Sequence, residues 1–351
     1  MQDRIDKNLV IENTMFDESM EIYDVTKEPF KIYGNSKSAE NIFARMNEKA
    51  AEKVSDAVSN RGARCAGVRL RFKTDSKRIG IRANLFVSFH APSLTTFSAL
   101  AFDVYAGNKY VNSAFPQSAE VKQENLYEQV VNLEGGMQDI TIYFPYNAVV
   151  KDFCIALDKN ATVLPAEEYR DMLPIVFYGS SITHGMCVSR PGIAFTAKIG
   201  RNLNMDYRNL GFSGAARGEE AMADYLASLK KSVLVCEYDH NEPSAEELSK
   251  RHLPFYKRIR ETDKNTPILF ISRPDERDAN EAHKRMKIVE ATYNYAIENG
   301  DKNVYFIDGL TLFPDDIRYD CTVDTVHPND LGAHMISLKL TEKLKEILGI
   351  D

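Results

Sequence analysis

The sequence has only five cysteines among 351 residues, and no two of them stand in a Cys-x-x-Cys arrangement. An odd number of cysteines without that spacing indicates neither a disulfide framework nor a structural zinc site. No histidines, cysteines or carboxylates recur at the spacing of a His-Glu-x-x-His motif, and no glycine-rich nucleotide-binding loop is present. The sequence therefore predicts chemistry done by side chains alone, with no metal and no other cofactor.

Long apolar runs and clusters of basic residues are also missing. No window approaches 18 consecutive apolar residues, so neither a transmembrane helix nor a membrane partner is expected. The formal net charge is -7 and is spread along the chain, which argues against nucleic acid as a partner. The N-terminus is polar and mixed in sign, unlike a signal peptide, so a cytoplasmic location is expected. Homo-oligomer formation stays open.

From about residue 60 to 165, apolar and polar residues alternate with period two. Val68 and Leu70, for example, alternate with Arg69 and Arg71, a pattern typical of half-buried strands. Turn signals separate these runs, at residues 75–76, 106–108 and 134–136. Short strands with regular turns predict an antiparallel β-sandwich of jelly-roll-like form. A short helix over residues 39–58 is expected before it.

After residue 165 the pattern changes to strands that alternate with helices. The strand candidates are residues 175–178, 206–209, 233–238, 268–272 and 304–307. A helix over residues 244–260 follows a capping box of Ser244 and Glu247. Such alternation predicts an α/β, doubly wound parallel sheet with helices on both faces. Because 351 residues exceed one core of usual size, we expect two domains, the β-sandwich over residues 1–165 and the α/β domain over residues 170–351.

Two short motifs lie near the two ends of the α/β region. Residues 179–183 read Gly-Ser-Ser-Ile-Thr and follow an apolar run, which places a hydroxyl group on the turn after a strand. Near the end of the chain, Asp324 stands three residues before His327, where it can hold that imidazole in the tautomer that takes a proton from a serine. Ligands bind beyond the carboxyl ends of strands in such sheets. The two motifs together predict one hydrolase site.

Residues 170–350 resemble the SGNH (GDSL-like) hydrolase superfamily. Its four blocks appear here in order, as residues 179–183, 209–214, 238–241 and 324–327. Residues 101–105 read Ala-Phe-Asp-Val-Tyr, close to the Gly-x-Asp-Leu-Tyr signature of a β-sandwich domain that precedes some bacterial carbohydrate esterases of this superfamily. The resemblance thus covers most of the chain.

The resemblance implies a nucleophile, a general base and an acid. Ser181 is the candidate nucleophile, which needs a neighbouring base to remove its proton. His327 is the candidate base, and Asp324 would orient it and stabilise the imidazolium. Ser180 stands where the superfamily usually has Asp, so a direct catalytic role is not expected for it.

The resemblance also implies an oxyanion hole, whose donors stabilise the negative charge of the tetrahedral intermediate. The superfamily's donors map onto the backbone N–H of Ser181, the backbone N–H of Gly214 and the side chain of Asn241. Gly211 is an alternative to Gly214. The usual Gly-x-Asn-Asp block is written here as Tyr-Asp-His-Asn, at residues 238–241.

Basic and aromatic residues are expected along the substrate cleft. These are Tyr178, Arg190 and Arg273, since guanidinium groups bind hydroxyls and carbonyls in a fixed geometry; a structural ion pair is the alternative for each arginine. His184 and His240 also fall in loops at the predicted active edge. A structural role or contact with the substrate is favoured for both histidines over the role of base, and His240 is counted among the substrate-binding residues.

The resemblance implies a serine esterase that forms an acyl-enzyme on Ser181. The superfamily includes lipases, thioesterases and acetylesterases, so the fold alone does not choose the substrate. With its N-terminal sandwich, the chain resembles enzymes that remove acetyl groups from plant polysaccharides. The expected substrate is therefore an acetylated hemicellulose oligosaccharide derived from mannan or xylan. Two alternatives stay open: a lipid or thioester acyl hydrolase, and a catalytically inactive carbohydrate-binding protein.

Overall fold

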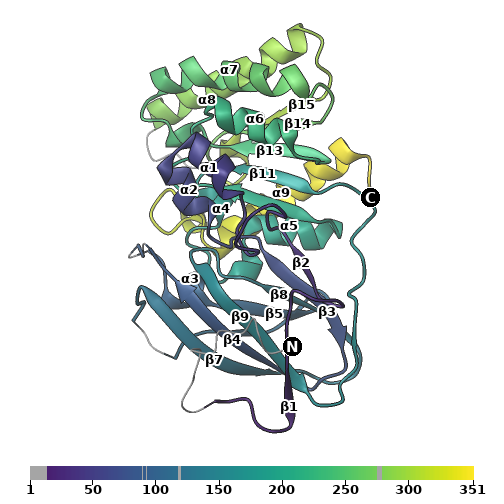
Figure 1. The fold of residues 1–351 in the computed structure, drawn as a ribbon. Coiled ribbons are helices and arrows are strands. Elements are labelled where there is room, and N and C mark those ends of the chain that lie inside the picture. Colours follow the sequence, from purple (N-terminus) through teal and green to yellow (C-terminus); the bar gives the residue numbers. More distant parts are fainter. Residues whose placement is uncertain (1–13, 89, 92, 118–119, 275–278) are drawn as a thin grey trace.

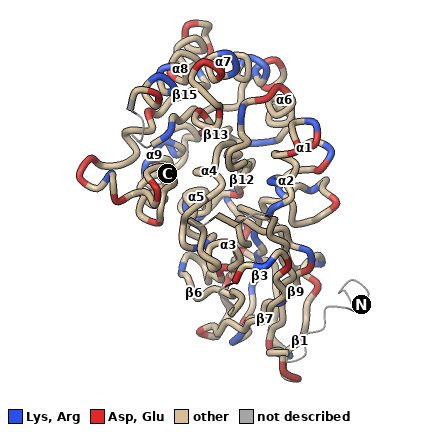
Figure 2. Tube along the Cα trace, turned by 90° about the vertical axis from the view of Figure 1, so that its left-hand side faces the viewer, with Lys and Arg blue, Asp and Glu red and all other residues tan. Residues whose placement is uncertain are grey.

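The computed structural model describes residues 14–351 except 89, 92, 118–119 and 275–278. Figure 1 shows two antiparallel sheets at one end of the molecule, and a parallel sheet covered by helices at the other. In Figure 2 acidic and basic residues are interspersed along the outer helices α7 and α8. Within the described part of the chain, no helix is both long enough and apolar enough for a membrane crossing.

The antiparallel sheets pack face to face as a sandwich. One has the strand order β1-β9-β4-β7, and the other β10-β3-β8-β5-β6, with β2 paired to β3. The strands are β1 (Met20–Tyr23), β2 (Lys31–Tyr33), β3 (Arg69–Thr74), β4 (Arg78–Phe86), β5 (Phe102–Ala106), β6 (Lys109–Ala114), β7 (Glu124–Asn132), β8 (Gln138–Tyr143), β9 (Val149–Asp158) and β10 (Val163–Leu164). Leu70, Ile81 and Ile142 belong to the core between the sheets. The predicted β-sandwich is confirmed.

The third sheet is parallel and has the order β12-β11-β13-β14-β15. Its strands are β11 (Ile175–Gly179), β12 (Tyr207–Gly211), β13 (Val233–Glu237), β14 (Ile268–Ile271) and β15 (Val304–Ile307). β11 lies between β12 and β13, so the strand that follows β11 in the sequence is added on one side of it, and all later strands are added on the other side. Such a switch point opens a crevice at the carboxyl ends of the strands. The predicted doubly wound fold is confirmed.

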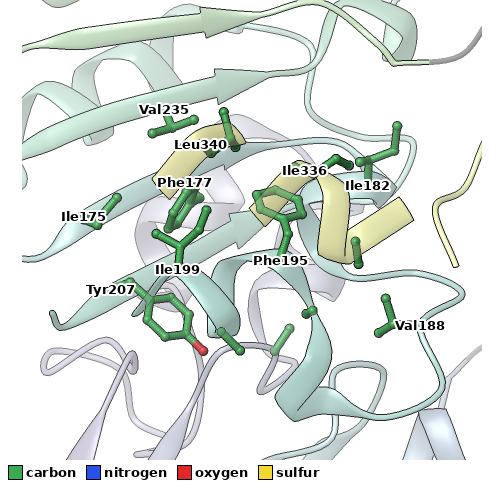
Figure 3. Close-up of a cluster of buried hydrophobic side chains, with 14 of the residues drawn as sticks. Ile175, Phe177, Ile182, Val188, Phe195, Ile199, Tyr207, Val235, Ile336 and Leu340 are labelled. Atoms are coloured by element: carbon green, nitrogen blue, oxygen red, sulfur yellow. The ribbon is translucent and has the colours of Figure 1, made fainter. Parts of the chain in front are cut away.

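Helices cover both faces of the parallel sheet. The longer ones are α5 (Phe195–Leu203), α6 (Glu220–Ser228), α7 (Ala245–Thr262), α8 (Ala279–Glu298) and α9 (Asp330–Leu348). Alternate residues of β11 face opposite layers, as expected for a strand. Ile175 and Phe177 join the cluster of α5 and α9 that Figure 3 shows, whereas Val176 and Tyr178 join the cluster of α6, α7 and α8. Both faces of this strand are therefore buried.

Shorter helices connect these layers. They are α3 (Thr96–Leu100), α4 (Ser181–His184), η1 (Pro191–Ile193), η2 (Asp239–Asn241), η3 (Gly309–Thr311) and η4 (Arg318–Cys321). At the start of α7, Ser244 Oγ accepts the backbone N–H of Glu247 at 3.2 Å, which confirms the predicted N-terminal cap.

The helix predicted over residues 39–58 is instead two short helices, α1 (Glu48–Val54) and α2 (Asp56–Gly62). Ser55 ends the first and caps the second, since its Oγ accepts the backbone N–H of Val58 at 3.2 Å. Both helices pack on the parallel-sheet side of the molecule, where Met46, Ala51 and Val58 join the core beneath α6. Figures 1 and 2 both place α1 near α6.

The polar side of β3 forms part of the contact between the two regions. A half-buried strand would expose Arg69, yet this residue is 0% exposed. Its Nη2 lies 2.5 Å from Asp206 Oδ1, its Nε donates to Tyr169 Oη at 2.7 Å, and its Nη1 donates to the carbonyl oxygen of Tyr207 at 3.2 Å. Period two in the sequence thus marks a strand whose polar face is covered by the second region.

Asp206→Ala should lower the free energy of unfolding by about 3 kcal/mol, because it leaves the buried charge of Arg69 without its acid partner. Urea unfolding followed by circular dichroism measures this change. The exposed ion pair of Glu246 and Lys250 supplies the matched control, and Glu246→Ala should change the free energy of unfolding far less than Asp206→Ala does. Equal effects of the two substitutions would contradict the assignment of Arg69 to a buried ion pair.

Candidate active site

Ser181, His327 and Asp324 form one chain of hydrogen bonds at the carboxyl edge of the parallel sheet. Ser181 Oγ lies 2.8 Å from His327 Nε2, and His327 Nδ1 lies 2.7 Å from Asp324 Oδ2. An ionised carboxylate can only accept, so Nδ1 carries the proton and Nε2 is free to take one from the serine. The geometry is that of a serine nucleophile with an oriented base.

The nucleophile stands on a sharp turn between β11 and α4. Ser181 is the first residue of α4, and Ser180 Oγ accepts the backbone N–H of Ile182 at 3.0 Å as the N-terminal cap. A Cβ atom at Gly179 would overlap with Thr183 Oγ1 and with the backbone of β13, so only glycine fits at that position. Ser181 is left 7% exposed at the end of the sheet.

A buried carboxylate supports this turn from the neighbouring strand. Glu237, the last residue of β13, accepts Ser180 Oγ at 2.9 Å and Thr183 Oγ1 at 2.8 Å. Position 180 thus carries a serine that is bonded to an acid from another strand. Glu237 was not predicted from the sequence, where the available signal was a carboxylate directly after the apolar run 233–236.

The turn that carries the acid and the base is held by its own backbone. Asp324 Oδ1 accepts the backbone N–H of His327 at 2.8 Å and that of Val326 at 3.2 Å. Burial raises the pKa of Asp324, but these hydrogen bonds and the one from the His327 ring outweigh it and lower the pKa below its usual value. Asp324 therefore stays ionised. Thr325 has a φ of 68°, a left-handed conformation that is rare for a β-branched residue.

The structure distinguishes between the two glycines considered for the oxyanion hole. The backbone N–H of Gly211 donates to Asn209 Oδ1 at 3.0 Å, and a Cβ atom at Gly211 would overlap with the backbone of His184. Gly214, in contrast, is exposed, has a φ of 68° and has open space around its Cα. Asn241 Nδ2 is buried and has no hydrogen-bond partner among the described residues. Gly214 and Asn241 thus remain the candidate donors.

His184 is a structural link, which excludes it as the base. Its Nε2 lies 2.5 Å from the carbonyl oxygen of Tyr146, and its Nδ1 lies 2.6 Å from Ser213 Oγ. A carbonyl can only accept, so Nε2 carries the hydrogen and Nδ1 accepts from Ser213. Burial, together with the charges of Arg45 and Arg64, lowers the pKa of His184 well below its usual value. The neutral ring joins the nucleophile helix to the turn that contains Gly214.

Arg45 holds the strand that leads to this turn, although it comes from the segment before the sandwich. Its guanidinium is 0% exposed and donates to the carbonyl oxygens of Asn209 at 3.0 Å and Gly211 at 2.9 Å. Further donor groups bind the carbonyls of Arg61 and Arg64 at 2.6 and 3.1 Å. Burial lowers the pKa of Arg45 to about 9. No sequence pattern marked this residue, because its partners are backbone carbonyls far along the chain.

The structure corrects the prediction for Tyr178. This residue is 0% exposed, its hydroxyl accepts the backbone N–H of Gly218 at 3.0 Å, and its ring stacks on Phe255. It therefore lies in the core between the sheet and the helices, where it has no exposed surface to offer a substrate.

The structure also corrects the prediction for Arg190. Its Nη1 donates to Asp103 Oδ2 at 3.0 Å and to Tyr105 Oη at 2.7 Å, and the backbone N–H of Gly192 donates to the same Asp103 oxygen at 2.7 Å. A buried carboxylate of the sandwich thus binds Arg190, which was expected to bind the substrate. The segment that resembles Gly-x-Asp-Leu-Tyr forms a contact between the two regions.

Arg273 and His240 lie beyond the carboxyl ends of β14 and β13. The backbone N–H of Arg273 donates to Asp239 Oδ2 at 3.2 Å. His240 Nδ1 lies 3.3 Å from Asp239 Oδ1 and 3.4 Å from Glu237 Oε1. The ligand atoms of Glu237, Asp239 and His240 lie within 4.8 Å of one another, the one grouping among the described residues that could hold a metal ion. Glu237 is already bonded to the nucleophile turn, so hydrogen bonds account for the grouping.

Comparisons with known families give a match for each region of the chain. Residues 172–345 match the GDSL-like lipase/acylhydrolase family. Residues 20–163 match the N-terminal domain of SGNH-hydrolase-type esterases. None of the curated proteins matches this sequence.

Solved structures share the fold of both regions. A candidate GDSL-like lipase from Bacteroides ovatus has a TM-score of 0.83 at 23% identity, over 95% of this chain and 99% of that chain. A salicylyl-acyltransferase from a tetracycline biosynthetic pathway has a TM-score of 0.78 at 18% identity, over 95% and 98%. An acetyl xylan esterase from Butyrivibrio proteoclasticus has a TM-score of 0.58 at 13% identity, over 94% and 99%. The chain belongs to the SGNH (GDSL-like) hydrolases and carries the N-terminal domain found in esterases of that group.

Proposed function

We propose that the protein is a serine esterase that works through an acyl-enzyme on Ser181. The observation that carries this proposal is the hydrogen-bond chain from Ser181 through His327 to Asp324. Such a chain activates a hydroxyl that is otherwise a weak nucleophile. A carbohydrate-binding protein without activity would have no need for it.

The reaction proceeds in two halves. Ser181 Oγ attacks the ester carbonyl carbon while His327 Nε2 takes the hydroxyl proton, and the oxyanion binds the N–H groups of Ser181 and Gly214 and the side chain of Asn241. His327 then gives its proton to the departing alcohol. In the second half, water attacks the acyl group while His327 takes a proton from that water. His327 then returns the proton to Ser181 Oγ as the bond to the acyl group breaks, which releases the carboxylic acid and restores the free serine.

A pocket of about 500 Å³ lies beside the turn that carries Asp324 and His327, and residues of both regions of the molecule line it. Val323, which directly precedes Asp324, and Cys187 line one side, while Ser93, Thr95 and Ser98 come from the sandwich region. Small hydroxyl side chains next to apolar ones suit a sugar ring, which offers hydroxyl groups at its rim and C–H bonds on its faces.

Arg273, which is half-buried beyond the end of β14, is kept as a proposed substrate-binding residue.

We therefore propose an acetylated oligosaccharide, of the mannan or xylan type, as the substrate. The shared fold with an acetyl xylan esterase supports this choice. A lipid or thioester hydrolase is the alternative, and the length of the preferred acyl group separates the two.

Rates on 4-nitrophenyl esters should fall steeply from acetate to octanoate, because a pocket built for an acetyl group loses about 1–3 kcal/mol for each misplaced methylene group. Acetate should also be released from acetylated manno- or xylo-oligosaccharides. Steady-state kinetics and an enzymatic acetate assay measure both. Rates that rise with chain length, together with no acetate from any oligosaccharide, would favour the lipid or thioester substrate.

A further inference from the structure

We infer that His240 is a catalytic residue whose Nε2 donates a hydrogen bond to the oxyanion formed at Ser181. This inference rests on the proposed esterase reaction. It gives His240 a role in the transition state, beyond the substrate contact expected from the sequence.

The first support is the position of His240 relative to the nucleophile turn. Its Nδ1 lies 3.4 Å from Glu237 Oε1. The same carboxylate accepts Ser180 Oγ and Thr183 Oγ1, at 2.9 and 2.8 Å, and these two residues flank Ser181. The imidazole and the nucleophile turn therefore contact one and the same buried carboxylate.

The second support is an unused donor site on His240. Its side chain is only 9% exposed, and Nε2 is buried without a hydrogen-bond partner among the described residues. The adjacent Asn241 Nδ2 is buried and unpartnered as well. Leaving such groups unpaired costs free energy, so unpaired buried groups call for an explanation. One acceptor that arrives with the substrate would satisfy both, and the oxyanion is such an acceptor.

The third support is the charge around the ring. Because Asp239 Oδ1 and Glu237 Oε1 both face Nδ1, that nitrogen carries a proton, and a second proton on Nε2 gives an imidazolium. Burial lowers the pKa of His240 and so does the charge of Arg273, but Asp239 and Glu237 outweigh both and raise the pKa above its usual value. Arg285, which donates to the carbonyl oxygen of Asp239 at 2.6 Å, is a further cation near this cluster. A charged donor stabilises an oxyanion more strongly than a neutral one.

Two substitutions of His240 test the inference with 4-nitrophenyl acetate. His240→Ala should lower kcat by about 10²–10³-fold with little change in KM, because the donor acts only in the transition state. His240→Gln keeps an N–H donor that does not titrate, so it should recover part of the rate. Wild type should lose activity as rising pH removes the second proton of the His240 imidazolium. His240→Gln should not show this loss at alkaline pH. His334→Gln, an exposed histidine of α9, serves as the matched control and should behave as wild type.

Binding of a trifluoromethyl ketone, which forms an oxyanion on the serine, adds a readout that a merely structural role would not change. The ketone should bind His240→Ala about 10²–10³-fold more weakly, in line with kcat. Thermal unfolding of each variant verifies that it is folded. A kcat within threefold of wild type in His240→Ala would overturn the inference, as would an unchanged alkaline limb in His240→Gln or loss of wild-type activity with a chelator. If Ser181→Ala retains activity, the esterase proposal itself falls, whatever the His240 variants do.

Discussion

Ser181→Ala should abolish ester hydrolysis, with kcat falling by about 10⁶-fold, a loss of the size seen when a serine hydrolase loses its nucleophile. The change removes one hydroxyl from the end of a sheet, and Ser181 Oγ bonds only the base His327 among the contacts described above. Folding should be unaffected. Hydrolysis of 4-nitrophenyl acetate and the thermal unfolding curve measure the two effects.

Ser180→Ala is the matched control, since it removes the neighbouring hydroxyl. Ser180 Oγ donates to Glu237 and caps α4, so its loss should weaken activity without ending it. A fluorophosphonate should label Ser181 in wild type and in Ser180→Ala, and mass spectrometry identifies the modified residue. Labelling of another serine with Ser181 untouched would show that the nucleophile is assigned wrongly.

His327→Ala should lower kcat by about 10⁶-fold, and Asp324→Asn by about 10⁴-fold. The alanine variant has no base. In the asparagine variant the ring remains, but the side-chain amide can donate to Nδ1 and so favour the tautomer with hydrogen on Nε2, which cannot take the serine proton. Steady-state kinetics of both variants provide the comparison, and unchanged activity in His327→Ala would refute the mechanism.

The pH profile gives an independent measurement of the same assignment. Wild-type kcat/KM should fall on the acid side as His327 takes a proton and can no longer accept one from Ser181. Hydrogen bonds lower the pKa of Asp324 below its usual value, so protonation of this carboxylate does not account for the loss of activity. A flat profile across the acid range would contradict the base role.

The residues proposed for catalysis could be named from the sequence because each lies in a short motif. Ser181 follows β11, and the spacing of Asp324 and His327 is fixed within one turn, so local sequence suffices. Gly214 could be preferred over Gly211 only weakly from the sequence. The structure shows why they differ, since the backbone N–H of Gly211 is taken by Asn209.

The errors concern residues whose partners are distant in the sequence. Tyr178 was placed in the cleft because it lies near the carboxyl end of a strand, but both faces of that central parallel strand are covered. For Arg190 a structural ion pair was left open as the alternative to substrate binding, and the sequence could not decide between the two because the acid partner, Asp103, lies in the other region. Arg69 and Arg45 were missed for the same reason. Charged residues can be read from a sequence, but their distant partners cannot.

The place of Arg45, α1 and α2 changes how the molecule can be divided. We keep residues 1–165 and 170–351 as a proposed division along the sequence, but the segment around Arg45 completes the core beneath α6 and binds the carbonyls of Asn209 and Gly211. In space, the core around the parallel sheet is therefore completed by a segment that lies between β2 and β3 of the sandwich in the sequence. A fragment that begins at residue 170 would lack this segment and would so lose part of its own interior, which makes the α/β part dependent on residues from the first half of the chain.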